Sequence, residues 1–308
     1  MATNLCISQE PIIFTRYLYN KIDVKQSLLI SMLNRDKDEA LFWAYELYYS
    51  GFYVDTFEYI INIYREMYSL LNPKLVLFIN ELLTEWSTDK TLDCNIGSII
   101  VTLINREYDV NYFVQRYFGI KCKENTINRH QKFKFKIKLT NRDIVPYKTI
   151  TNRRADTVLK HACRYPIHKE YNKLFEVNVP SREILREIYY YHWLYYCLDT
   201  PVWRQRIFDY KGRLDHDLKK VEFDDEDNLQ CFYDNWGYYP DEQPYNVDNN
   251  ILGPELDDQQ YGVMDFCMRY EATPIIRKVK NNGRCHSSVI EETTEINIPL
   301  TNSIQYRN

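Results

Sequence analysis

Two groups of residues have side chains that could do chemistry, and neither has the spacing of a known site. His161, Cys163 and His168 could bind zinc, yet zinc modules space their ligands differently and need a second pair. Asp224 to Asp227 are four successive carboxylates, whereas Mg²⁺ is usually held by one or two carboxylates set apart. We interpret the first group as a partly buried histidine beside a structural cysteine, and the second as a solvated acidic loop.

The common catalytic motifs are absent from the sequence. With only eight glycines, the chain has no G-x-x-x-x-G-K-[ST] loop to hold phosphates, and it lacks H-E-x-x-H, G-x-S-x-G and EF-hand patterns. Many active sites assemble from scattered residues, so an enzyme with a dispersed site remains the least favoured alternative. We predict no catalytic residues, no metal and no cofactor.

Lysines alternate with apolar residues over 132–139. A period of two predicts a half-buried strand with a lysine-rich outer face. Such lysines protect an edge strand from aggregation, or they contact the phosphates of a nucleic acid. Six further basic residues follow and would enlarge either surface: Arg142, Lys148, Arg153, Arg154, Lys160 and Arg164. The candidate nucleic-acid contacts are therefore Lys132, Lys134, Lys136, Lys138, Arg142, Arg153 and Arg154.

The charge of the chain is divided into three blocks. Residues 1–120 carry 15 acids and 10 bases (net −5), residues 121–173 carry 4 and 15 (net +11), and residues 174–308 carry 24 and 14 (net −10), which together give −4. The basic block 121–173 suits nucleic acid. It suits equally well an acidic partner or the protein's own acidic segment 215–258, which also carries many aromatic residues.

Targeting and cysteine usage predict an intracellular protein. The N-terminal residues lack a basic region followed by an apolar core, which a secretory signal needs. No apolar run is long enough to span a membrane. The eight cysteines never form C-x-x-C, and free cysteines in a reducing compartment fit this spread better than disulfides.

The N-terminal third is predicted to be a stack of amphipathic helices. Asp36 with Glu39, and Asp55 with Glu58, each fit the D-x-x-E capping box at a helix start. Gly51 is placed to end the helix between them. Short connections make successive helices antiparallel neighbours. A recurring two-helix unit of this size predicts either a HEAT-like stack or an irregular bundle, and both alternatives stay open.

Later segments predict further helices and then an irregular end. A strongly amphipathic helix is predicted to open at Pro180-Ser181, and its apolar face consists of Ile184, Leu185, Ile188, Tyr191, His192 and Tyr195. It runs into the aromatic stretch 189–196, and a helix that is apolar on nearly every face is usually buried. Thr200-Pro201 provides the cap and first turn of the next helix, with Trp203 and Ile207 facing inward. Residues 295–300 read as a short strand.

The fold class predicted is therefore mainly α, with a small β element near 132–139. We divide the chain into a helical hairpin stack (1–120), a basic-then-aromatic mixed helical domain (121–240) and an extended, acidic and irregular C-terminal segment (241–308).

Two stretches resemble uncharacterised proteins of nucleocytoplasmic large DNA viruses. These are Ser27–Ile30 with Asp38–Phe52, and His192–Tyr196 with Pro201–Trp203. The resemblance implies a place in the host cytoplasm, at the viral factory, or in the virion, and it implies no activity. Asp36–Gly51 is also similar to the helical C-terminal region of clamp-loader-like ATPases, but the ATPase motifs are absent and no function is carried over.

These observations favour a non-enzymatic viral helical scaffold or adaptor that binds a protein partner, because the helical stack carries no catalytic constellation. The alternative is a nucleic-acid-binding accessory factor of viral replication, transcription or translation that uses the basic block 121–173. The two hypotheses differ in whether the acidic segment 215–258 covers the basic block: if it does, the nucleic-acid alternative largely falls.

Overall fold

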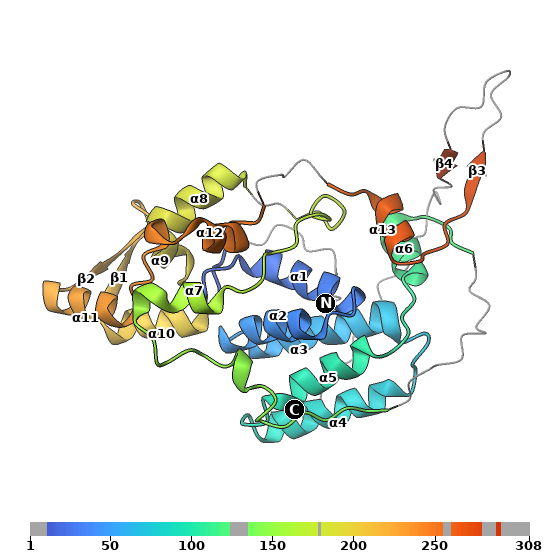
Figure 1. Cartoon of the computed structure of the whole chain (residues 1–308), viewed down its shortest axis with the longest axis horizontal. Helices are drawn as coiled ribbons and strands as arrows, with labels where there is room; N and C mark the ends of the chain where they lie inside the picture. Colours follow the sequence, from blue (N-terminus) through green and yellow to red (C-terminus); the bar gives the residue numbers. More distant parts are fainter. Residues whose placement is uncertain (1–10, 124–134, 178–179, 255–259, 279–287, 291–308) are drawn as a thin grey trace, which may run out of the picture.

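Helices make up most of the chain, as the sequence predicts (Figure 1). The computed structural model describes residues 11–123, 135–177, 180–254, 260–278 and 288–290. In these ranges the α-helices are α1 (Lys21–Leu33), α2 (Lys37–Tyr49), α3 (Tyr53–Ile63), α4 (Leu75–Thr88), α5 (Cys94–Ile104), α6 (Asn111–Phe118), α7 (Val158–Ala162), α8 (Arg182–Tyr191), α9 (Trp193–Tyr196), α10 (Pro201–Asp209), α11 (Glu226–Trp236), α12 (Tyr245–Leu252) and α13 (Val263–Arg269). Shorter helical turns are η1 (Tyr64–Tyr68), η2 (Val145–Tyr147), η3 (Ala155–Thr157) and η4 (Pro240–Glu242).

Helix α2 is the centre of the N-terminal stack. It packs against α1, α3, α5 and the short turn η2. The sequence predicts one apolar face on this helix, but residues 39–48 are buried on every side. A helix surrounded by neighbours must offer apolar or internally bonded side chains all round. Because α2 meets four other elements, polar side chains on it are placed to cross-link the fold.

Local capping signals are correct where no distant residue competes for the side chain. Asp36 caps α2 by accepting a hydrogen bond from the Glu39 amide, as predicted. Gly51 follows the end of α2 at a φ of 98°, and a Cβ there would lie 2.7 Å from Pro201. The prediction for Asp55 is wrong: α3 begins earlier, at Tyr53, and the Asp55 carboxylate instead forms ion pairs with two lysines of α1.

A loop of residues 14–20, which we call the N-terminal loop, is buried at the heart of the molecule. The Arg16 guanidinium donates to Glu46 of α2 at 2.9 Å, and both side chains are almost fully buried. Arg16 also donates to the Tyr147 carbonyl (2.9 Å) and to the Thr149 hydroxyl (3.1 Å). On the other side, the Trp203 indole of α10 donates to the Thr15 carbonyl. The loop thus joins α2 to segments from the middle of the chain.

The predicted strand over 132–139 is not a strand in the part that the structure describes, 135–139; residues 132–134 lie outside the described ranges. Residues 135–149, which we call the belt, instead run along the outside of the helical stack, first without regular structure over 135–140 and then through a turn and η2. The amides of Leu139 and Ile137 donate to the hydroxyls of Ser98 (2.8 Å) and Thr102 (3.0 Å) on α5. A helix supplies the hydrogen bonds that a partner strand would have supplied.

The aromatic stretch after Ser181 is not one buried helix. Ser181 caps α8 as predicted, but the helix ends at Tyr191, and α9 begins after a break at His192. Ile184 and Tyr191, both predicted to face inward, are 51% and 66% exposed. Only one side of α8 meets the rest of the protein, so the helix is amphipathic, as predicted, but lies at the surface. In contrast, Trp203 and Ile207 of α10 are fully buried, as predicted.

The described strands form two small antiparallel pairs at positions the sequence did not indicate. Strand β1 (Gly212–Asp215) pairs with β2 (Lys220–Phe223), and β3 (Ile276–Lys278) pairs with β4 (Ser288–Ile290). Figure 1 shows α8 to α12 with β1 and β2 gathered at one end of the molecule, and α13 beside α6 at the other. The strand predicted at 295–300 lies outside the described residues.

Candidate functional site

The predicted phosphate-binding residues that the structure describes are spread over several segments and do not follow one another along a single strand. Lys132 and Lys134 are outside the described residues. Lys136 and Lys138 are exposed on the belt beside α4, and Arg142 follows in the turn before η2. Arg153 and Arg154 are exposed next to η3, where the chain has left α4. The described part of the basic block is therefore wrapped along the helical stack.

Three described cations of the basic block are paired inside the molecule, two of them with acids of the N-terminal third and one with an acid of the block itself. The Lys138 ammonium lies 3.0 Å from Glu81 and 3.3 Å from Glu85 on α4. The Lys148 ammonium lies 3.2 Å from Asp93. Arg154 pairs with its neighbour Asp156 through both ends of its guanidinium. By contrast, Arg142 and Arg153 form no ion pair with any described residue.

The acidic segment 215–258 meets the basic block mainly through backbone groups. The buried Lys169 ammonium donates to the Leu252 carbonyl at 2.6 Å, at the C-terminal end of α12, where a cation is favoured. The Asn250 amide donates to the Cys163 carbonyl, and the Gln243 amide donates to the Asp156 carbonyl. In the described parts of the chain, the carboxylates that pair with the block thus come from the N-terminal stack and, at Asp156 and Glu170, from the block itself.

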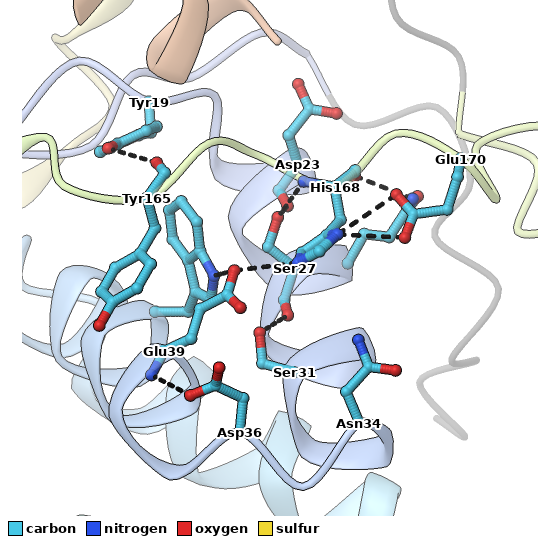
Figure 2. Close-up of polar contacts among 12 residues, drawn as sticks. Tyr19, Asp23, Ser27, Ser31, Asn34, Asp36, Glu39, Tyr165, His168 and Glu170 are labelled. Carbon is cyan, nitrogen blue, oxygen red and sulfur yellow. Dashed lines mark hydrogen bonds and ion pairs between the residues drawn. The ribbon is translucent and has the colours of Figure 1, made fainter. Parts of the chain in front are cut away.

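His168 lies between two carboxylates (Figure 2). A histidine that contacts a carboxylate is an arrangement also found in active sites, so its chemistry is considered first. Its Nε2 lies 2.9 Å from Glu39 of α2, and its Nδ1 lies 3.1 Å from Glu170. The Trp43 indole donates to the same Glu39 oxygen at 3.0 Å. The His168 amide donates to the Ser27 hydroxyl of α1. Backbone and ring together join α1, α2 and the segment after α7.

The protonation state of His168 decides what this arrangement can do. Burial by itself lowers the pKa, but the hydrogen bonds and charges of Glu170 and Glu39 outweigh it and raise the pKa to about 9. At neutral pH both ring nitrogens therefore carry protons and donate to carboxylates. A general base or a nucleophile needs a free nitrogen lone pair, which this histidine lacks. The arrangement is that of a structural cross-link.

The residues considered for metal binding are not brought together. His161 is exposed on α7, whereas the Cys163 thiol is buried against the Tyr17 carbonyl. Burial raises the pKa of that thiol well above its usual range, so it stays protonated. Asp225 caps α11, and Asp224 pairs with Arg213. Among the described residues, no group of three or more histidines, cysteines or acids is arranged to hold a metal ion.

The outer face of α4 carries an open groove of about 640 Å³, which sequence reasoning missed. Leu77 is 70% exposed there, and Glu81, Glu85 and Asp89 line the same groove. The buried face of this helix consists of Leu75, Phe78, Ile79, Leu82 and Trp86. Leu77 lies off that face. An apolar residue on the solvent side of an amphipathic helix is the signal that would have pointed to this groove.

None of the described helices combines the length and the apolar character that crossing a membrane requires.

Comparisons with known proteins give no match to this chain. The sequence matches no family model, and neither the curated proteins nor the solved structures contain a match to it.

Proposed function

We propose that this protein is a non-enzymatic helical scaffold that binds a protein partner through the groove on α4. The partner segment that fits this groove is amphipathic and bears lysines or arginines. The observation that carries the proposal is the groove itself, in which an exposed leucine lies beside three carboxylates. On the viral resemblance, we place such a complex in the viral factory or in the virion.

The chemistry of the groove supports a basic, apolar partner. Residues 77, 80, 81, 84, 85 and 88 follow the three- and four-residue spacing of one helix face, so they form a continuous strip. Leu77 and the half-buried Leu92 offer apolar contact, and Glu81, Glu85 and Asp89 offer negative charge. An amphipathic segment binds such a strip by laying its apolar face on the leucines.

The belt supplies an internal example of this recognition. Lys138 reaches Glu81 and Glu85 from an extended segment that lies beside α4. All three side chains are well exposed, and an exposed ion pair of this kind contributes only about 0.2–1 kcal/mol. A partner lysine can therefore share or replace this contact at little cost.

The experiment uses a fluorescent synthetic peptide that is helical, with leucines along one face and lysines beside them. Fluorescence anisotropy measures its affinity for the full chain. We expect Leu77→Asp to weaken binding by about tenfold or more, because burial of a leucine contributes about 1.5–3 kcal/mol. The matched control is Leu229→Asp, which changes an exposed leucine on α11, outside the groove.

Charge provides the second half of the test. Replacing the lysines of the peptide with glutamates is expected to abolish binding, since the groove is acidic. Equal binding of both peptides, or equal affinity of the wild-type protein and Leu77→Asp, would contradict a docking site on α4.

Nucleic-acid binding is the second candidate, and the exposed guanidinium groups of Arg142 and Arg153 favour it. Because Lys138 is already paired, these arginines are the phosphate contacts that we would expect. Binding to a mixed-sequence oligonucleotide would weaken steeply with salt. The double substitution Arg142→Ser with Arg153→Ser would reduce the salt slope by about two, whereas Lys138→Ser would change it little. No binding at low salt removes this candidate.

A further inference from the structure

A cleft of about 350 Å³ lies between the first turn of α2 and the bend of the belt at η2. Its walls include Lys37 and Asp38 from α2, Asp143 and Tyr147 from the belt, and Arg164 and Tyr165 from the segment after α7. None of these residues lines the groove on α4, so the two surfaces are separate. The volume is at the lower end of the range for small-molecule pockets, about 300–1,000 Å³.

The acids of the cleft have hydrogen-bond partners within the protein. Asp38 accepts a hydrogen bond from the Tyr147 hydroxyl at 3.3 Å. Asp143 accepts from both the amide (2.7 Å) and the hydroxyl (2.8 Å) of Thr140, and these bonds, with the nearby charge of Lys37, hold the pKa of Asp143 below its usual range. Each carboxylate keeps lone pairs for further donors.

The cations of the cleft are less engaged. Neither Lys37 nor Arg164 forms an ion pair with any described residue. The Arg164 guanidinium makes one long hydrogen bond, 3.4 Å to the Pro146 carbonyl. It is held near three rings, with its central carbon 5.7 Å from the ring centre of Phe42 and 6.0 Å from those of Tyr147 and Tyr165. The guanidinium is therefore positioned by aromatic contacts while its charge remains available for an anion.

The aromatic walls are also fixed in place. Tyr147 stacks on Tyr45 of α2, with ring centres 5.5 Å apart and an angle of 19° between the planes. The ring centres of Tyr165 and Phe42 are 5.2 Å apart, and the Tyr165 carbonyl accepts a hydrogen bond from the hydroxyl of the buried Tyr19. Rings that do not reorganise on binding favour a flat ligand, because little conformational freedom is lost.

We propose that this cleft binds a small anion of the mononucleotide class. Lys37 and Arg164 contact its phosphate, the free lone pairs of Asp38 and Asp143 accept hydrogen bonds from its hydroxyl or amino groups, and Tyr147 and Tyr165 flank its flat ring. The site is independent of the groove on α4, and it assigns the protein a ligand that a plain scaffold would not need.

Isothermal titration of the full chain with adenosine monophosphate tests this site, with adenosine and ribose 5-phosphate as partial ligands. We expect millimolar or tighter binding of the nucleotide and markedly weaker binding of each fragment. Arg164→Gln and Lys37→Gln should each weaken nucleotide binding by about tenfold, since each removes a charge-assisted hydrogen bond. Lys160→Gln, at an exposed lysine of α7 that does not line the cleft, is the matched control.

Three results would overturn the proposal. They are no nucleotide binding in the millimolar range, binding that survives both Arg164→Gln and Lys37→Gln, and equal affinity for the nucleotide and either fragment. Lys37 is exposed at the start of α2, so its substitution should leave the fold intact even if Arg164→Gln does not, and the unfolding midpoint of each variant checks this.

Discussion

At the scale of single residues, His168 shows how a titratable group can serve the fold. Its ring is 22% exposed, and each nitrogen meets a carboxylate. The charged form satisfies both carboxylates at once, which is why its pKa is raised to about 9 in spite of burial. A neutral imidazole would have to place a lone pair against one of the two carboxylates.

Stability should therefore depend on pH through His168. The folded pKa of about 9 exceeds the pKa of an unfolded histidine, about 6.5. Its contribution is thus complete below about pH 6.5 and is lost as the pH rises through about 9. A shift of this size corresponds to a free energy on the order of 3 kcal/mol. We expect urea unfolding to show His168→Gln strongly destabilised at pH 6.5 and much closer to wild type at pH 10.

His161→Gln provides the control, because His161 is exposed on α7. A direct readout is the NMR titration of the His168 ring in the wild-type protein. A midpoint at or below that of a free histidine would show that the two carboxylates do not hold the proton.

The partners of His168 could not be foreseen from the sequence. His161, Cys163 and His168 attract attention because they are neighbours in the chain, but Glu39 lies 129 residues away from His168. Spacing patterns report on residues that share an element, and this cross-link joins two elements that meet only after folding. The same is true of Arg16, whose contacts at Tyr147 and Thr149 lie more than 100 residues downstream.

At the scale of elements, the belt shows that alternation indicates which side chains are buried but not which element the extended chain bonds to. Ile137 and Leu139 are half-buried while Lys136 and Lys138 are exposed, so the predicted sidedness is correct over 136–139, but it is wrong at Phe135, which is 78% exposed. The partner is not another strand but the hydroxyls of Ser98 and Thr102 on α5. These two residues are four apart on one helix face, and their spacing matches alternate amides of an extended chain.

Removing these hydroxyls should loosen the belt. We expect Ser98→Ala and Thr102→Val each to lower the free energy of unfolding by about 1–3 kcal/mol, because a partly buried amide loses its acceptor. Thr102→Ser should retain most of the stability. Hydrogen exchange should accelerate at the amides of Leu139 and Ile137, respectively.

Ser87→Ala is the matched control, since the Ser87 hydroxyl bonds only to a carbonyl of its own helix on an exposed face. Its expected effect is within about 0.5 kcal/mol. Unchanged stability and unchanged exchange in Ser98→Ala would mean that the hydroxyl does not fasten the belt.

Helix ends were predictable when the decisive contact was local. Asp36, Ser181 and Thr200-Pro201 all stand where the sequence placed them. Burial was harder to predict, because it depends on which elements surround a helix. The sequence favoured the aromatic stretch 189–196 as the buried centre, whereas α2 holds that position and α8 lies on the surface. The groove on α4 was missed for the same reason.

At the scale of the whole molecule, the fold places cations of the basic block beside acids of the N-terminal stack. The basic block follows the acidic N-terminal stack, and it contributes Lys138, Lys148 and His168 to ion pairs with acids of that stack. The block also reaches the C-terminal part through Lys169 and the end of α12. A segment with contacts on both sides joins the N-terminal stack to α12, which bears on the domain division at residue 120.

We predict that a fragment of residues 1–120 does not fold by itself. In the fragment, buried polar groups of the stack lose their partners, and each orphaned group costs about 1–3 kcal/mol. The lost contacts are Glu39 with His168, Arg16 with Thr149 and the Tyr147 carbonyl, Phe14 with Tyr196 and Thr200, and Thr15 with Trp203. Their sum is comparable to the whole stability of a typical domain, about 5–15 kcal/mol.

The fragment should therefore lack the near-ultraviolet circular dichroism of fixed aromatic packing and should unfold without a cooperative urea transition, while the full chain shows both. A fragment that unfolds cooperatively, with the midpoint of the full chain, would instead establish 1–120 as an independent domain, and the cross-links at Arg16 and Glu39 would then be dispensable for it.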